Sequence, residues 1–147
     1  MRSAAVFVIF ALVLMYGAAA VAHEESEESS SETRMDEMME NMDMKMQHKT
    51  METIAEHWAE AREALKEKEW KEAGGAVAEM EEAAKGMMGF KPHRNADKPD
   101  LFMNKHGLFM KRLKDLGKAI ESRDAAAAEK LAAAVQKSCN QCHAMFR

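Results

Sequence analysis

Residues 124–147 read DAAAAEKLAAAVQKSCNQCHAMFR, and this C-terminal stretch carries the strongest structural signal in the chain. Its apolar residues recur at spacings of three and four, which predicts an amphipathic helix from about Asp124 to Phe146. One side of that helix would carry Leu131, Val135, Cys139, Cys142 and Phe146. A helix with a single apolar side is stable only when that side packs against other elements.

The same spacing predicts three more amphipathic helices, at about residues 42–68, 70–88 and 101–122. Alanine, glutamate, lysine, methionine and leucine dominate these segments, and all five favour helix. The first and third connections are very short, so the helices that they join should be antiparallel neighbours. The one longer link, residues 89–100, holds both prolines. The sequence therefore predicts an all-α protein, an up-down-up-down antiparallel four-helix bundle.

Two consecutive glycines, Gly74 and Gly75, fall inside the second of these helices. Each costs about 1 kcal/mol of helix stability relative to alanine. The pair indicates either a close approach to a neighbouring helix or a break in the helix.

The N-terminus has the pattern of a secretory signal peptide. Arg2 precedes an apolar run over residues 4–16, and an Ala-x-Ala sequence ends at Ala22. We expect cleavage after Ala22, which removes residues 1–22 and exports the protein to the periplasm. The run is short for a bilayer span, so an uncleaved membrane anchor is the less favoured alternative, and no stable membrane insertion is expected after cleavage.

Residues 23–42 form an acidic, methionine-rich segment that we expect to be a flexible leader, because its serines and glutamates cannot bury a core. The four-helix domain would then occupy residues 43–147. Loss of Arg2 with the signal peptide takes the net charge from -4 to -5. An acidic protein of this kind is not expected to bind nucleic acid.

The only two cysteines, Cys139 and Cys142, are followed directly by His143. This Cys-x-x-Cys-His spacing is typical of covalent haem c attachment. On a helix both thiols lie on one face, where they can meet two vinyl groups of one porphyrin, and the histidine can bind the iron on its proximal side. The sequence therefore predicts one covalently bound haem c.

Besides a chance match, three other uses of the two cysteines are less favoured. A disulfide across three residues would close a loop too small to stabilise much. A structural zinc site needs four ligands, and the other histidines lack paired spacing. A thioredoxin-like pair belongs at a helix N-terminus, where the dipole lowers a thiol pKa, whereas this pair lies near a helix C-terminus.

The C-terminal pattern Cys-x-x-Cys-His-x-x-Phe-Arg at residues 139–147 resembles that of the cytochrome c′ family. The alanine-rich start of the same helix and Trp70, just after the first helix, extend the resemblance over about residues 43–147. It implies a four-helix-bundle haem domain and dimerisation through the first two helices. It also implies that the terminal Arg147 lies near the haem edge, although a cation there is also favoured by the helix dipole.

In that family the first helix supplies the residue on the distal face of the haem. Aligning residues 64–66 with the family places Met51 at this position, and Gln47 where an arginine is common. A methionine ligand implies a six-coordinate, low-spin electron carrier, and an open site implies a five-coordinate form that binds nitric oxide or carbon monoxide. The antiparallel arrangement of the first and last helices also brings Met51 towards His143.

Several side chains compete with this assignment. Met51 could be an ordinary core methionine. His48 is the alternative distal ligand, one turn earlier, and Met44 is the next candidate. His57 and His106 are expected to be exposed or core histidines.

A methionine-rich stretch precedes the domain and supports a hypothesis of a different class, a copper-binding module. Thioethers are soft ligands that suit Cu(I). Helical spacing explains the same pattern as an extension of the first helix, which we favour. The methionines are Met35, Met38, Met39, Met42, Met44 and Met46.

The sequence is expected to encode a periplasmic monohaem cytochrome that carries single electrons between redox partner proteins. It contains no nucleophile–base pair and no second set of metal ligands that would indicate an enzyme. The gas-binding form and the copper module are the two alternatives.

Overall fold

The structure, a computed structural model, describes the backbone of residues 4–147 and the side chains of residues 34–147. The described chain is all-α, with no strand. It divides into two compact units, Met1–Met44 and Lys45–Arg147, which are treated separately. The predicted signal peptide lies outside the described side chains and stays a prediction. Over the part of the chain that could be searched, no helix is long and apolar enough to cross a membrane.

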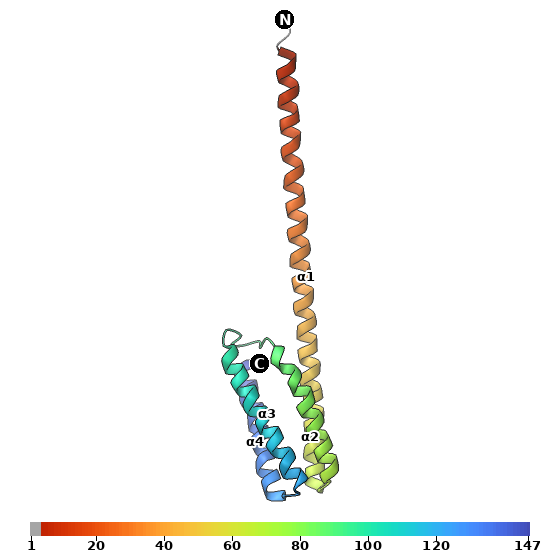
Figure 1. The fold of residues 1–147 in the computed structure, drawn as a ribbon, viewed down its shortest axis with the longest axis vertical. Coiled ribbons are helices and arrows are strands. Elements are labelled where there is room, and N and C mark those ends of the chain that lie inside the picture. Colours follow the sequence, from red (N-terminus) through yellow and green to blue (C-terminus); the bar gives the residue numbers. More distant parts are fainter. Residues whose placement is uncertain (1–3) are drawn as a thin grey trace. The chain divides into compact units, whose positions relative to one another are not determined.

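Four α-helices and one short 3-10 helix make up the described chain (Figure 1). They are α1 (Ala4–Glu67), α2 (Trp70–Lys85), η1 (Gly86–Gly89), α3 (Pro99–Glu121) and α4 (Ala125–Phe146). The last three α-helices lie within three residues of the predicted bounds. The first differs, because α1 begins at Ala4 and not near Met42, and no proline interrupts this stretch. The flexibility of residues 23–42 stays a prediction.

The short connections are tight turns that end one helix and start the next. Lys68 (φ 61°) and Arg123 (φ 53°) adopt left-handed backbone conformations after α1 and α3. In each turn the following amide bonds back to the preceding helix, as from Glu69 N to Ala64 O at 2.8 Å. The Asp124 side chain accepts a hydrogen bond from the Ala127 amide at 3.0 Å and so caps α4.

The core of Lys45–Arg147 draws its apolar side chains from all four α-helices. Helix α3 packs against both α2 and α4. The largest fully buried side chains are Met80, Leu113, Leu116, Val77 and Val135. Of the five residues predicted on the inner side of α4, Val135 and Phe146 are buried, whereas Leu131, Cys139 and Cys142 are half-buried.

The long connection caps the C-terminal end of α4, where the predicted haem motif lies. Asn95 adopts a left-handed conformation (φ 55°), and its Nδ2 donates to Met145 O at 2.7 Å. The Arg94 amide donates to Phe146 O at 3.2 Å. The last carbonyls of a helix lack partners within the helix, so these bonds tie the connection to the end of α4.

The two glycines of α2 lie in an unbroken helix, so the predicted alternative of a helix break is wrong. A Cβ at Gly74 would make ordinary contact with Ile120 Cγ2 at 3.5 Å, so this residue faces α3. At Gly75, apart from the adjacent residues and the nearby backbone of α2 itself, no atom would lie within 4 Å of such a Cβ. The close approach is therefore confined to Gly74, and Gly75 has only the entropic cost of glycine.

Gly75→Ala should stabilise the protein by about 1 kcal/mol, because alanine restricts the unfolded chain and meets no neighbour in the folded one. Thermal unfolding followed by circular dichroism should show a midpoint raised by about 4–8 °C. The matched comparison is Gly74→Ala, whose methyl group would make ordinary contact with Ile120 Cγ2 and should give at least the same gain. An unchanged or lower midpoint for Gly75→Ala would contradict the open environment at this position.

Candidate functional site

The two cysteines and the following histidine lie on the last turns of α4. Both thiols are free and half-buried, whereas His143 is exposed. Helical spacing turns Cys139 and Cys142 to the same side, and both contribute to the edge of the apolar core. The motif therefore faces inward with its sulfur atoms and keeps its imidazole near solvent.

Two neighbouring cavities adjoin this motif inside Lys45–Arg147. Their volumes are about 470 Å³ and about 200 Å³, and cofactor pockets commonly measure about 300–1,000 Å³. Cys139 lines the smaller cavity, and Cys142 and His143 line both. The residues shared by the two cavities are Met51, Ala55, Met87, Cys142 and His143.

The walls of the cavities are mainly apolar and partly aromatic. Phe90, Phe102 and Phe146 line the larger one, and Phe102 and Phe146 meet edge to face with ring centres 5.3 Å apart. Trp58 and Phe109 line the smaller one. Apolar walls around two thiols, an imidazole and a thioether have the chemistry that an attached haem requires, so the residues present fit this cofactor.

The local electrostatics keep the motif uncharged. Burial raises the pKa of the Cys139 thiol, and it raises the pKa of Cys142 although the Lys105 charge opposes it. Partial desolvation lowers the pKa of His143, and the Arg147 charge lowers it further. Neutral imidazole is the form that binds metal ions, whereas a raised thiol pKa disfavours the reactive thiolate of a thioredoxin-like pair.

A chain of side-chain hydrogen bonds ties α1 to the motif. Trp58 Nε1 donates to Gln136 Oε1 at 2.8 Å, across 78 positions of sequence. Gln136 Nε2 in turn donates to Asn140 Oδ1 at 3.0 Å. Asn140 lies between the two cysteines, so this chain sets the rotation of the motif relative to α1. Because the two residues lie on different helices and far apart in the sequence, no local pattern indicated that Trp58 and Gln136 would pair.

A second polar contact ties α3 to the same part of α4. Arg112 donates from Nη1 to Ser138 Oγ and to the Ala134 carbonyl, the latter at 3.2 Å. Ser138 is buried with 7% exposure and directly precedes Cys139. Hydrogen bonds from α1 and from α3 therefore both hold the part of α4 that carries the motif.

The candidate distal residues differ in where they lie. Met51 is half-buried and lines both cavities together with His143. His48 is exposed and lines only the larger cavity, where its ring centre is 5.8 Å from that of His93. Met44 belongs to the other unit and is 37% exposed. Iron ligation by any of them stays a prediction.

The larger cavity has a polar rim that the sequence identified only in part. Arg147 and Gln47 both line it, and a place for Arg147 at a haem edge stays a prediction. His93 and Pro92, from the long connection, were not identified as site residues. Their distance in sequence from both helices of the site left no periodic signal.

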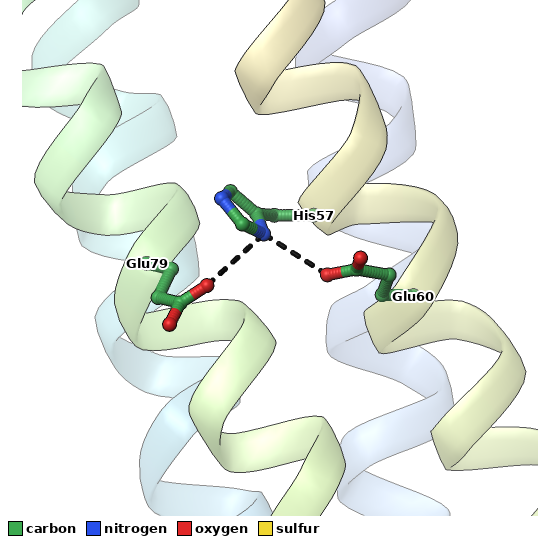
Figure 2. A network of polar contacts seen from close by, with 3 residues as sticks. All are labelled: His57, Glu60 and Glu79. Atoms are coloured by element: carbon green, nitrogen blue, oxygen red, sulfur yellow. Dashed lines mark hydrogen bonds and ion pairs between the residues drawn. The ribbon is translucent and has the colours of Figure 1, made fainter.

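The two remaining histidines of residues 34–147 have different roles. His106 is buried with 7% exposure, and its Nε2 lies 2.8 Å from Ala84 O, so it is a core histidine, as one of the two expectations held. His57 lies outside both cavities and contacts Glu60 and Glu79 (Figure 2). The sequence did not indicate this cluster, because Glu79 comes from another helix.

No family model, curated protein or solved structure matches this chain. The resemblance to the cytochrome c′ family therefore rests on the residues quoted for it, above all on the nine C-terminal ones.

Proposed function

We propose that this protein is an exported monohaem c-type cytochrome that carries single electrons between redox partner proteins. The observation that carries the proposal is the convergence of Cys139, Cys142 and His143 on apolar cavities that Met51 also lines. The free, half-buried thiols and the neutral imidazole are in the chemical forms that attachment and ligation need.

The thiols of Cys139 and Cys142 would each add across one vinyl group. Each S–H bond would be replaced by a thioether C–S bond to a vinyl carbon, and the thiol proton would pass to the other vinyl carbon, so that Cys139 and Cys142 would hold the cofactor to α4. The addition leaves no net change in oxidation state. Three-residue spacing on α4 holds the two sulfur atoms on one face for two such additions.

The surrounding residues would control the redox behaviour of the site. A bound haem supplies a one-electron Fe(III)/Fe(II) couple. His143 would hold the iron from the α4 side and Met51 from the α1 side, and a thioether ligand favours the reduced state. The apolar walls exclude water and disfavour the extra positive charge of Fe(III), so they also favour the reduced state. His143 and Arg147 are exposed, so a redox partner could approach the proposed haem site from the C-terminal end of α4.

We further infer that Lys45–Arg147 is an up-down-up-down antiparallel four-helix bundle. The tight turns after α1 and α3 and the packing of α3 on both α2 and α4 support this topology. The bond from Trp58 to Gln136 supports α1 and α4 as neighbours. Export to the periplasm, where the attachment would take place, rests on the signal-peptide pattern of residues 1–22.

The purified protein should retain haem under denaturing conditions, because two thioether bonds survive unfolding. Gel electrophoresis in detergent followed by staining for haem peroxidase activity should show a coloured band at the mass of the protein. Cys139→Ala combined with Cys142→Ala should abolish the stain, and the exposed α4 control Lys130→Ala should keep it. A colourless wild-type band, or haem extracted by acid acetone, would disprove covalent attachment.

Met51→Ala should open the sixth coordination site. The wild type should be low-spin and show a weak near-infrared band from sulfur-to-ferric charge transfer. The variant should lose this band, bind carbon monoxide readily and have a lower reduction potential, whereas His48→Ala should change none of the three. A change in His48→Ala alone would move the distal assignment to that residue, and a high-spin wild type would make the protein a five-coordinate binder of nitric oxide or carbon monoxide.

The exposed methionines of α1 favour copper binding as a second candidate function. Met35, Met38, Met39 and Met42 have exposures of 59%, 69%, 52% and 62%. Their positions repeat at three and four residues, so they share one side of the helix and none is used in the core. Thioethers grouped in this way suit Cu(I).

Replacement of these four methionines by leucine should abolish Cu(I) binding if the second candidate is correct. The measurement is competition against a chromophoric Cu(I) chelator under reducing conditions. Met88→Leu and Met103→Leu serve as controls, because these methionines are also exposed but lie elsewhere. Equal copper affinity in the wild type and the fourfold variant would eliminate the copper module.

A further inference from the structure

His57 and Glu60 on α1 and Glu79 on α2 bring three metal-ligating atoms together (Figure 2). Within residues 34–147 this is the one group of at least three such side chains whose ligand atoms all lie within 4.8 Å of one another. His57 Nδ1 lies 3.0 Å from Glu60 Oε2 and 3.3 Å from Glu79 Oε2. All three residues belong to Lys45–Arg147, and none lines either cavity.

The helices explain why these side chains meet. His57 and Glu60 are three residues apart and therefore share one face of α1. The two-residue connection between α1 and α2 lies about three turns from His57 and about three turns from Glu79. The two residues therefore lie at the same height along the two helices. The His57 side chain is 21% exposed, whereas the Glu60 and Glu79 side chains are 64% and 67% exposed. A partly fixed imidazole with two movable carboxylates can adjust to an ion.

The separations match those of ligands around a small tetrahedral ion. Zinc binds imidazole nitrogen and carboxylate oxygen at about 2.0–2.2 Å, which puts neighbouring ligand atoms about 3.3–3.6 Å apart. The two separations from His57 Nδ1, 3.0 and 3.3 Å, are at or just below this range. Small rotations of the exposed carboxylates would open the site to the required size.

The charges of the cluster also favour a cation. Two carboxylates converge on one imidazole, and among the ion pairs of the described residues no lysine or arginine contacts either of them. A dication would balance both carboxylates. The imidazole ligand favours a transition metal such as zinc over magnesium or calcium, which prefer oxygen ligands alone.

We propose that His57, Glu60 and Glu79 bind one Zn²⁺-type dication that links α1 to α2, with water in the fourth position. This site is separate from the proposed haem site and uses none of its residues. The competing explanation is a surface ion pair of a protonated His57, which would contribute little to stability and would not bind metal.

The test is zinc titration by isothermal calorimetry on the mature, haem-containing protein after treatment with a chelator. The wild type should bind one equivalent, and His57→Gln and Glu79→Gln should each weaken binding by about tenfold or more. Zinc should also raise the thermal midpoint of the wild type by about 5 °C or more at a hundredfold excess over its dissociation constant. Glu82→Gln is the matched control, because Glu82 is an exposed α2 carboxylate that pairs with Lys85 and should leave zinc binding unchanged.

Two results would overturn the proposal. One is the absence of zinc binding by the folded wild type, which would leave an ion pair. The other is equal zinc affinity in all variants, which would place the metal elsewhere, for example at His48 and His93. If circular dichroism shows that His57→Gln does not fold, the zinc affinities of Glu60→Gln and Glu79→Gln test the proposal, because both variants replace exposed side chains. The haem stain is read independently on the same samples, so failure of one proposal leaves the other standing.

Discussion

The inward side of α4 near its C-terminus must fill the core and present the cysteines at the same time. Val135 is fully buried and Phe146 is 5% exposed, so the helix is anchored in the core on both sides of the motif. Cys139 and Cys142 lie between these anchors on the same apolar side. Any rotation of α4 that moved the thiols would also expose its core residues, so packing and site geometry depend on one another.

Polar contacts between helices fix the register of α4 against its neighbours, which apolar side chains alone would not specify. Trp58 and Gln136 join α1 to α4, and Arg112 and Ser138 join α3 to α4. Both contacts lie within one turn of Cys139. Partly buried hydrogen bonds of this kind tolerate little change in register, because an unpaired polar group in the interior is costly. The long connection between η1 and α3 adds a further contact, because Asn95 donates a hydrogen bond to Met145 O near the end of α4.

Helix boundaries could be predicted from the sequence wherever a local signal marks them. Asp124 caps α4, and Pro99 stands at the first position of α3, where its missing amide proton costs nothing. No such signal supports the predicted start of the first helix near Met42, because residues 23–41 contain neither proline nor glycine, and α1 begins at Ala4. The prediction there relied on where the apolar stripe began, and an apolar stripe marks the extent of packing and not the extent of a helix.

The sequence by itself determined the helical class, the short connections and the spacing of Cys139, Cys142 and His143, because these depend on neighbours within one or two turns. Only the tertiary structure decided which side chains meet across helices: Trp58 with Gln136, His106 with Ala84, and His57 with Glu79. Each of these pairs depends on the rotation and register of two helices. Periodicity specifies which face of a helix is buried, but rotation and register result from the close packing of all the helices together.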